Sequence, residues 1–241
     1  MCTVTFVPLN ETNFVLTSNR DEAPNRLSLA PDFDEINQVK ILYPKDEISG
    51  GTWIGASEKN RVLCILNGGF GWHERQVKYR HSRGIIVKDL LVSENLQKSV
   101  SRYDLERIEP FTLVMVDWID SLRCYELIWD GIAKHFNELA VEPMIWSSST
   151  LYTEAMKNER VQWFDAFKKE QDLTPATLLN FHKVAGKGNL DYGIIMDRGF
   201  VKTTSITQIR KEYNKLDMHF FDLVNAKDSS TTLTTLQLLN E

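Results

Sequence analysis

The first two dozen residues alternate hydrophobic and polar positions in the manner of a β-hairpin. Residues 2–7 are rich in β-branched side chains, and residues 13–18 form a second run of the same kind. The segment between them carries the proline, asparagine and small polar residues that favour a turn. A turn centred in this segment pairs Cys2 with Asn19, within two positions. The pattern therefore predicts a hairpin that brings residues 18–22 beside the start of the chain.

Similar β-rich runs predict strands along much of the remaining chain. Strands are expected at 52–57, 61–66, 111–118, 122–129, 132–139, 200–209 and 218–224. Residues 23–49 contain three prolines and mixed charge, and we interpret them as a long irregular connection able to form a flap over a site.

Helical periodicity, with apolar residues three and four positions apart, occurs in three segments. We expect helices at 82–101, at 151–170 with Val161, Phe164 and Phe167 on one stripe, and from Pro175 to about Val184 behind an N-cap at Thr174. The order of strands, helix, strands, helices and strands indicates an α+β fold, with helices packed on antiparallel sheets.

Composition narrows the class of protein. The 241 residues are 42% hydrophobic and 25% charged, which is enough apolar material for one large core. The net charge of −5 argues against a general nucleic-acid binder. No run approaches the roughly 18 apolar residues of a membrane span, and the start does not read as a signal peptide. We therefore expect no stable membrane insertion.

The three cysteines are too few for a disulfide scaffold. Cys64 and Cys124 lie in strand-like apolar runs, and we interpret both as buried structural residues in a protein of the reducing cytoplasm. No HExxH or CxxC spacing supports a metal site, so no metal and no cofactor is expected.

Cys2 is the strongest candidate for a catalytic residue. A small residue after Met1 allows removal of the methionine, which would leave Cys2 with both a thiol and a free α-amine. An α-amine has a pKa of roughly 7.7–8.0, so it can accept the thiol proton near neutral pH. Arg20 and Asp21 lie just past the predicted strand end, where a guanidinium lowers the thiol pKa and a carboxylate holds the ammonium form.

The sequence at this point resembles a known family. The start Met-Cys-Thr followed by SNRDE at residues 18–22 resembles the NRDE family, also called the Transport and Golgi organisation protein 2 family, which looks like a branch of the N-terminal nucleophile hydrolases. The resemblance covers the whole chain. It continues in residues 50–55 (GGTWIG), 66–69 (LNGG), 145–149 (IWSSS) and 201–205 (VKTTS).

The resemblance implies a four-layer αββα sandwich, as in the penicillin V acylases and bile salt hydrolases, formed here by a single domain over residues 1–241. It also implies catalytic roles for Cys2, Asp21 and Arg20, and an oxyanion-hole role for Asn67. An Asn–Gly turn is common in its own right, so both interpretations of Asn67 stay open. Arg20 stands two positions later than the corresponding arginine of the acylases, which lies where this chain has Ser18.

Five further residues are candidates for substrate binding. They are Asn19, Trp53, Trp72, Ser148 and Lys202. Trp72 follows Gly71 in a glycine- and aromatic-rich segment, and Trp53 lies two positions from Gly51 and from Gly55. Ser148 stands where relatives often have asparagine, and a serine side chain has a shorter reach. Lys202 stands where relatives often have arginine, and lysine keeps the charge but lacks the planar hydrogen-bonding fork.

Two function classes follow. The first is an N-terminal cysteine hydrolase that cleaves a carbon–nitrogen amide bond of a small molecule. The second is a non-catalytic binding or trafficking protein for haem or a lipid-like ligand, as the family association with the secretory pathway and haem handling implies.

Overall fold

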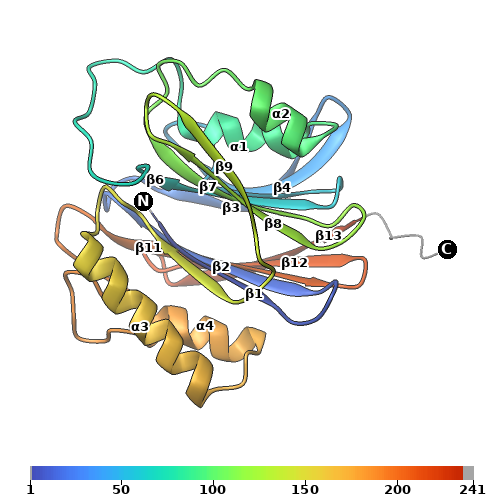
Figure 1. The fold of residues 1–241 in the computed structure, drawn as a ribbon. Helices are drawn as coiled ribbons and strands as arrows, with labels where there is room; N and C mark the ends of the chain where they lie inside the picture. The colour runs from blue at the N-terminus through green and yellow to red at the C-terminus, as the bar shows by residue number, and fades with distance from the viewer. Residues whose placement is uncertain (1, 236–241) are drawn as a thin grey trace.

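The computed structural model describes residues 2–235, with the backbone alone at position 2. Two antiparallel sheets are stacked face to face, and a pair of helices covers the outer face of each (Figure 1). The first sheet has the strand order β10-β1-β2-β11-β12-β13. Its strands are β1 (Cys2–Pro8), β2 (Phe14–Glu22), β10 (Met144–Ser147), β11 (Lys202–Glu212), β12 (Lys215–Asp222) and β13 (Lys227–Thr234).

The second sheet is built from consecutive strands in the order β3 to β9. They are β3 (Ser28–Ile36), β4 (Val39–Asp46), β5 (Ile54–Ser57), β6 (Arg61–Asn67), β7 (Phe111–Asp117), β8 (Arg123–Trp129) and β9 (Lys134–Leu139). The strands of both sheets pair in antiparallel fashion with their neighbours.

The helices form the two outer layers. Helices α1 (Arg83–Leu91) and α2 (Leu96–Arg102) cover the second sheet, and α3 (Glu154–Glu170) and α4 (Pro175–Val184) cover the first (Figure 1). The Thr174 side chain caps α4 as predicted, accepting a hydrogen bond from the Thr177 amide. None of the helices within residues 2–235 has the length and apolar character needed to cross a bilayer.

Alternation along β1 and β2 divides their side chains between two cores. Phe6, Phe14 and Leu16 enter the large core between the sheets, which also reaches the underside of α1 and α2. Val7 and Val15 enter a smaller core beneath α3 and α4. Each strand of this hairpin is thus buried on both faces, and the polar positions of the alternation, such as Thr3, Thr5 and Thr17, are buried as well.

Most predicted elements are confirmed. The N-terminal hairpin, the strand pair β5–β6, the hairpin β7–β8, strand β9 and the helices α3 and α4 lie where the pattern placed them. The hairpin register differs by one position from the centred turn, because Cys2 pairs with Arg20 and not with Asn19. Cys64 and Cys124 are buried in strands, as expected.

The interpretation of residues 23–49 as an irregular flap is wrong, because they contain the hairpin β3–β4. Proline is tolerated there since β3 is an edge strand, and its pairing shifts register between Leu29 and Asp32, around Pro31. The single helix at 82–101 is also wrong. The chain leaves α1 after Leu91, and the Asn95 side chain starts α2 anew.

Two smaller errors concern the first sheet and its helices. Strands β10 and β13 were not predicted, since their sequences are short or rich in serine and threonine. Val161 does not share the buried stripe of α3, because its side chain is 40% exposed, and the neighbouring Arg160 is buried in its place.

Candidate functional site

The SNRDE segment lies within β2 and distributes its side chains to opposite faces of the first sheet. Asn19 and Asp21 face the α3–α4 layer, whereas Arg20 and Glu22 face the second sheet. Strand alternation alone produces this division. We call the first group the helix-side cluster and the second the cavity-side cluster.

The cavity-side cluster surrounds a small polar cavity of about 80 Å³ at one end of the sandwich. The lining comes from both sheets and from the start of α1: Arg20, Glu22, Arg26, Asp46, Ser49, Thr52, Trp53, Ile65, Asn67, Ser82, Arg83 and Gly84. The structure therefore brings together three of the predicted site residues, which are Arg20, Trp53 and Asn67. Their roles stay predictions.

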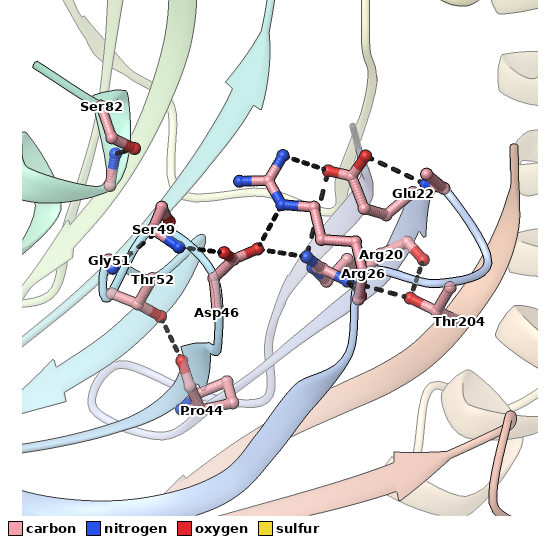
Figure 2. A network of polar contacts seen from close by, with 12 residues as sticks. Arg20, Glu22, Arg26, Pro44, Asp46, Ser49, Gly51, Thr52, Ser82 and Thr204 are labelled. Carbon is pink, nitrogen blue, oxygen red and sulfur yellow. Dashed lines mark hydrogen bonds and ion pairs between the residues drawn. The ribbon is translucent and has the colours of Figure 1, made fainter.

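Ion pairs between the two sheets hold Arg20 in place (Figure 2). Its Nη2 donates to Asp46 Oδ2 at 2.5 Å, and Arg26 Nε lies 2.8 Å from the same oxygen. Arg26 Nη1 in turn donates to Glu22 Oε2 at 3.1 Å. The Arg20 guanidinium also lies 4.7 Å from the centre of the Trp53 ring, which adds a cation–π contact.

Asp46 is ionised within this network. Burial acts to raise its pKa, but the Ser49 amide and the guanidinium groups of Arg26 and Arg20 outweigh burial, so the pKa of Asp46 is lowered from its ordinary value. Sequence reasoning did not select Asp46 or Arg26, because both lie in the region interpreted as a flap.

The GGTW motif forms one wall of the cavity. Gly50 has a φ of +66°, a conformation that glycine adopts without strain. Thr52 Oγ1 lies 2.7 Å from the carbonyl oxygen of Pro44 (Figure 2) and 2.7 Å from that of Ile54, and these two acceptors share its single proton. A Cβ added to Gly84 would lie 2.7 Å from the Thr52 backbone, so α1 begins in direct backbone contact with this motif.

Asn67 ends β6 at the cavity, and its backbone is anchored from the first sheet. The Ser148 hydroxyl donates to the Asn67 carbonyl oxygen at 2.7 Å. Because a serine hydroxyl has one proton to donate, Ser148 is here engaged in positioning Asn67. Ser148 is buried and does not line the cavity, and its role in substrate binding stays a prediction.

The helix-side cluster is centred on Asp21, which is fully buried. Tyr152 donates its phenolic proton to Asp21 Oδ2 at 2.7 Å, and Thr203 Oγ1 donates to Oδ1 at 2.8 Å. Burial raises the pKa of Asp21, and the positive charge of Arg160, together with the two hydroxyl hydrogen bonds, offsets only part of that rise.

Arg160 projects from α3 into the same cluster and is fully buried. Its guanidinium donates to Thr3 Oγ1 at 2.5 Å and to the carbonyl oxygens of Tyr192 and Gly193 at 2.9 and 2.8 Å. It also lies 3.6 Å from the centre of the Tyr152 ring. Sequence reasoning missed this residue, although it stands four positions before the buried Phe164 and so lies on the stripe that faces the sheet.

Asn19 is part of this sealed layer and does not reach the cavity. Its amide donates to the carbonyl oxygens of His182 and Ile194, each at 3.0 Å, and its Oδ1 lies 2.6 Å from His182 Nδ1. Burial and then the charge of Arg160 lower the pKa of His182 to about 3, so the imidazole is neutral. His182 is therefore a buried hydrogen-bonding residue of this layer, in contact with Thr5 and Asn19.

The remaining candidates are dispersed. Trp72 is 76% exposed and borders a separate hollow of about 360 Å³, lined mainly by residues 149–154. Lys202 pairs with Glu22 across β11 and β2 but does not line the cavity. The Cys2 side chain is outside the described residues. Its backbone is paired with Arg20 at the start of β1.

Two stacked antiparallel sheets between two helix layers define the class of fold, which is that of the N-terminal nucleophile hydrolases. The structure is similar to that of a Caenorhabditis elegans ortholog of N-acylethanolamine-hydrolyzing acid amidase, with a TM-score of 0.59 and 9% identity over 86% of this chain and 92% of that one. It is also similar to that of a variant of the conjugated bile acid hydrolase from Clostridium perfringens, with a TM-score of 0.54 and 10% identity over 100% of this chain and 99% of that one.

The sequence model of the family Transport and Golgi organisation 2 matches residues 1–187. The chain belongs to this family. No curated protein sequence matched it. The resemblance seen in the SNRDE and GGTW motifs is therefore confirmed, and so is the four-layer αββα fold.

Proposed function

We propose that this protein is an N-terminal cysteine amidohydrolase that acts on a carbon–nitrogen amide bond of a small molecule. The observation that carries the proposal is the β1–β2 register, which pairs Cys2 with Arg20. The strand start thus lies between the cavity-side cluster, which contains Arg20, and the helix-side cluster, which contains Asp21. Both the fold and the family support this assignment.

The proposed reaction begins after removal of Met1. The α-amine of Cys2 accepts the thiol proton, and the thiolate attacks the amide carbonyl carbon to form a tetrahedral intermediate. The carbon–nitrogen bond then breaks, the leaving amine takes a proton from the ammonium group, and a thioester remains. Water attacks the thioester, which releases the carboxylic acid and restores the thiol.

Three residues have proposed roles in this reaction. Asp21 holds the α-ammonium group, since each of its oxygens accepts one side-chain hydrogen bond and retains capacity for another. Asn67 donates to the oxygen that becomes negative in the intermediate, a contribution of roughly 3–4 kcal/mol for such donors. Ser148 positions Asn67 through the backbone.

The size and polarity of the cavity bear on the substrate. Its 80 Å³ is well below the roughly 300–1,000 Å³ of pockets that enclose a drug-sized ligand. The cavity therefore suits a small polar part of a substrate whose remainder lies outside it. One structural relative is named as an amidase that hydrolyses N-acylethanolamines, and the other as a conjugated bile acid hydrolase. By analogy, we propose a small-molecule amide.

The first experiment is the intact mass of the purified protein, followed by a screen of amide substrates. A mass lacking Met1, with turnover that is abolished by Cys2→Ala, is the expected result. Cys124→Ala is the matched control, because burial raises the pKa of that thiol to about 12 and keeps it unreactive. Retention of Met1 in the active protein, or equal turnover by Cys2→Ala, would overturn the proposal.

A second candidate function is non-catalytic binding of haem or a lipid-like ligand. The 360 Å³ hollow beside the exposed Trp72 favours this alternative, since it has more room than the cavity at Arg20. Titration with haem tests it directly. A saturable shift of the haem absorption band that Trp72→Ala abolishes would support binding there, and an unchanged spectrum would rule out haem.

A further inference from the structure

The segment 70–80 exposes large apolar side chains beside the cavity. Phe70 is 56% exposed, Trp72 is 76% exposed and Val77 is fully exposed. Folding alone does not account for three such side chains within eight positions, because each loses the benefit of burial. The segment belongs to the glycine- and aromatic-rich stretch noted in the sequence, and none of its residues lines the cavity.

A fourth exposed apolar residue lies next to this segment. Ile132, in the turn between β8 and β9, is 90% exposed. It lines a hollow of about 400 Å³ together with His73 and Tyr79 from the segment, so the two stretches of chain are neighbours. We call Phe70, Trp72, Val77 and Ile132 the apolar patch.

Positive charge accompanies the apolar patch. Segment 70–80 contains Arg75, Lys78 and Arg80 against one carboxylate, Glu74, whereas the whole chain carries a net charge of −5. The Arg80 charge is balanced by an ion pair with Asp104. Arg75, with a side chain 80% exposed and 3.8 Å from Glu109, and Lys78 project toward solvent.

Charged residues next to segment 70–80 also affect the local balance of charge. Arg107 is exposed and lines the same hollow as Ile132, while Asp130 lies there with its carboxylate directed to His135 at 2.7 Å. Glu109 is shared with Arg83 at 3.1 Å. Three exposed cations, Arg75, Lys78 and Arg107, therefore lie in segment 70–80 or line the hollow beside it, where Glu74 is also exposed.

We infer that segment 70–80 and Ile132 dock this protein on the surface of an anionic lipid bilayer. Tryptophan favours the boundary between lipid headgroups and acyl chains, and surface cations attract anionic headgroups. Because electrostatic attraction fades over about 8–10 Å in physiological salt, the local cations act on the bilayer more than the distant acidic groups do. This is peripheral binding by a loop and involves no membrane-spanning segment.

The docking surface adjoins the cavity through the chain itself. The segment follows Asn67 and precedes Ser82 and Arg83, all three of which line the cavity. A bilayer under the segment would therefore lie at the cavity end of the sandwich (Figure 1). The inference does not depend on the proposed hydrolase activity, since vesicle binding is measured without a substrate.

Co-sedimentation with phosphatidylcholine vesicles, with and without phosphatidylserine, tests the inference. Binding is expected with phosphatidylserine and should weaken as salt is raised. Trp72→Ala is expected to reduce the vesicle partition coefficient about tenfold, because its ring supplies the interfacial anchor. Lys78→Glu is expected to reduce it about fivefold or more.

Matched controls come from the far end of the first sheet. Tyr213 is 80% exposed in the β11–β12 turn, and Lys215 is exposed beside it. Glu212 pairs with Lys215, whereas Lys202, at the other end of β11, pairs with Glu22 of the cavity. Tyr213→Ala and Lys215→Glu should leave vesicle binding unchanged.

Three outcomes would overturn the inference. The first is the absence of binding to phosphatidylserine vesicles at low salt, and the second is equal loss in the control variants. The third is loss with Lys78→Glu but not with Trp72→Ala, which would indicate attraction to any acidic surface, such as an acidic protein. Unchanged thermal unfolding of each variant shows that the comparison is made between folded proteins.

Discussion

The two faces of β2 place adjacent residues of the SNRDE motif in different surroundings, because Asp21 faces the helices and Arg20 faces the cavity, where it pairs with Asp46. On the helix side, Asp21 is sealed from solvent and held by hydroxyl groups, and its pKa is raised. On the cavity side, Asp46 meets two guanidinium groups beside an open cavity, and its pKa is lowered. The same kind of side chain is therefore tuned in opposite directions within one end of the sandwich.

The difference shows what each face contributes. The helix-side cluster joins α3 to the start of β1, since Arg160 contacts both Thr3 and the Tyr152 ring. The cavity-side cluster joins the two sheets through Arg20 and Asp46. We therefore expect the first to govern stability around the strand start and the second to govern the shape of the cavity.

The largest expected effect is the loss of a buried arginine on the helix side. Arg160→Met should lower the free energy of unfolding by about 3–5 kcal/mol, because buried acceptors and the Asp21 carboxylate lose their partner. Arg20→Met should cost about 2 kcal/mol, since Asp46 keeps Arg26. Urea denaturation measures both values, and equal losses would contradict the division between the clusters.

The pH dependence of two asparagine variants gives the next largest effect. Asp46→Asn should cost about 3 kcal/mol at neutral pH, because two guanidinium groups lose a carboxylate. The lowered folded pKa of Asp46 supplies stability that is present above pH 3.8 and is lost as pH falls through the folded pKa. The difference between wild type and this variant should therefore shrink in acid.

Asp21→Asn should show the opposite slope. The raised folded pKa of Asp21 supplies stability that is complete below pH 3.8 and is lost as pH rises through the folded pKa. The difference between wild type and Asp21→Asn should therefore shrink as pH rises. Denaturation curves at several pH values measure both slopes, and slopes of the same sign would be the contrary result.

Two adjacent threonines allow a smaller and closely matched test. Thr203 donates to the buried Asp21 carboxylate at 2.8 Å, whereas Thr204 donates to the backbone carbonyl oxygen of Arg20 at 3.1 Å and accepts from the Arg20 guanidinium at 3.3 Å. A short hydrogen bond to a carboxylate contributes more than these two longer bonds, because hydrogen bonds weaken as they lengthen. Thr203→Val should cost about 2 kcal/mol and Thr204→Val about 1 kcal/mol. Thermal unfolding of the two variants side by side would expose a reversed order.

The smallest expected effect concerns Trp53. Its indole Nε1 is buried and has no hydrogen-bond partner among residues 2–235. Trp53→Phe removes this unsatisfied donor while keeping an aromatic ring under Arg20, so stability should change by less than about 1 kcal/mol. A much larger loss in calorimetry would indicate that the indole itself supports the cavity side.

Much of the fold was predictable because strand and helix periodicity survive in the sequence. The β1–β2 hairpin, β5 to β9 and the capped α4 follow local patterns. The hairpin β3–β4 was not predictable from its prolines: Pro31 lies in the edge strand β3, and Pro44 lies in β4 beyond the two residues that pair with β5. The break between α1 and α2 depends on Asn95, whose capping role a continuous apolar pattern obscured.

The site was predictable only in part. The pairing of Cys2 with a residue of SNRDE follows from hairpin geometry, and so does the alternation that separates Arg20 from Asp21. Arg160, Tyr152 and Asp46 come from distant parts of the chain, and only tertiary packing brings them to the motif. The alternation itself was available from the sequence, and it places Asn19 away from the cavity.

The contact between Gly84 and the Thr52 backbone has a consequence for how this protein can diverge. One wall of the cavity is set by main chain against main chain, where no side chain larger than hydrogen fits. Substitutions at Glu22, Arg26 or Ser49 can alter what the cavity accepts while that wall keeps its position. Point mutations in the side chains that line the cavity can thus change its specificity, whereas a substitution at Gly84 would displace the main-chain wall.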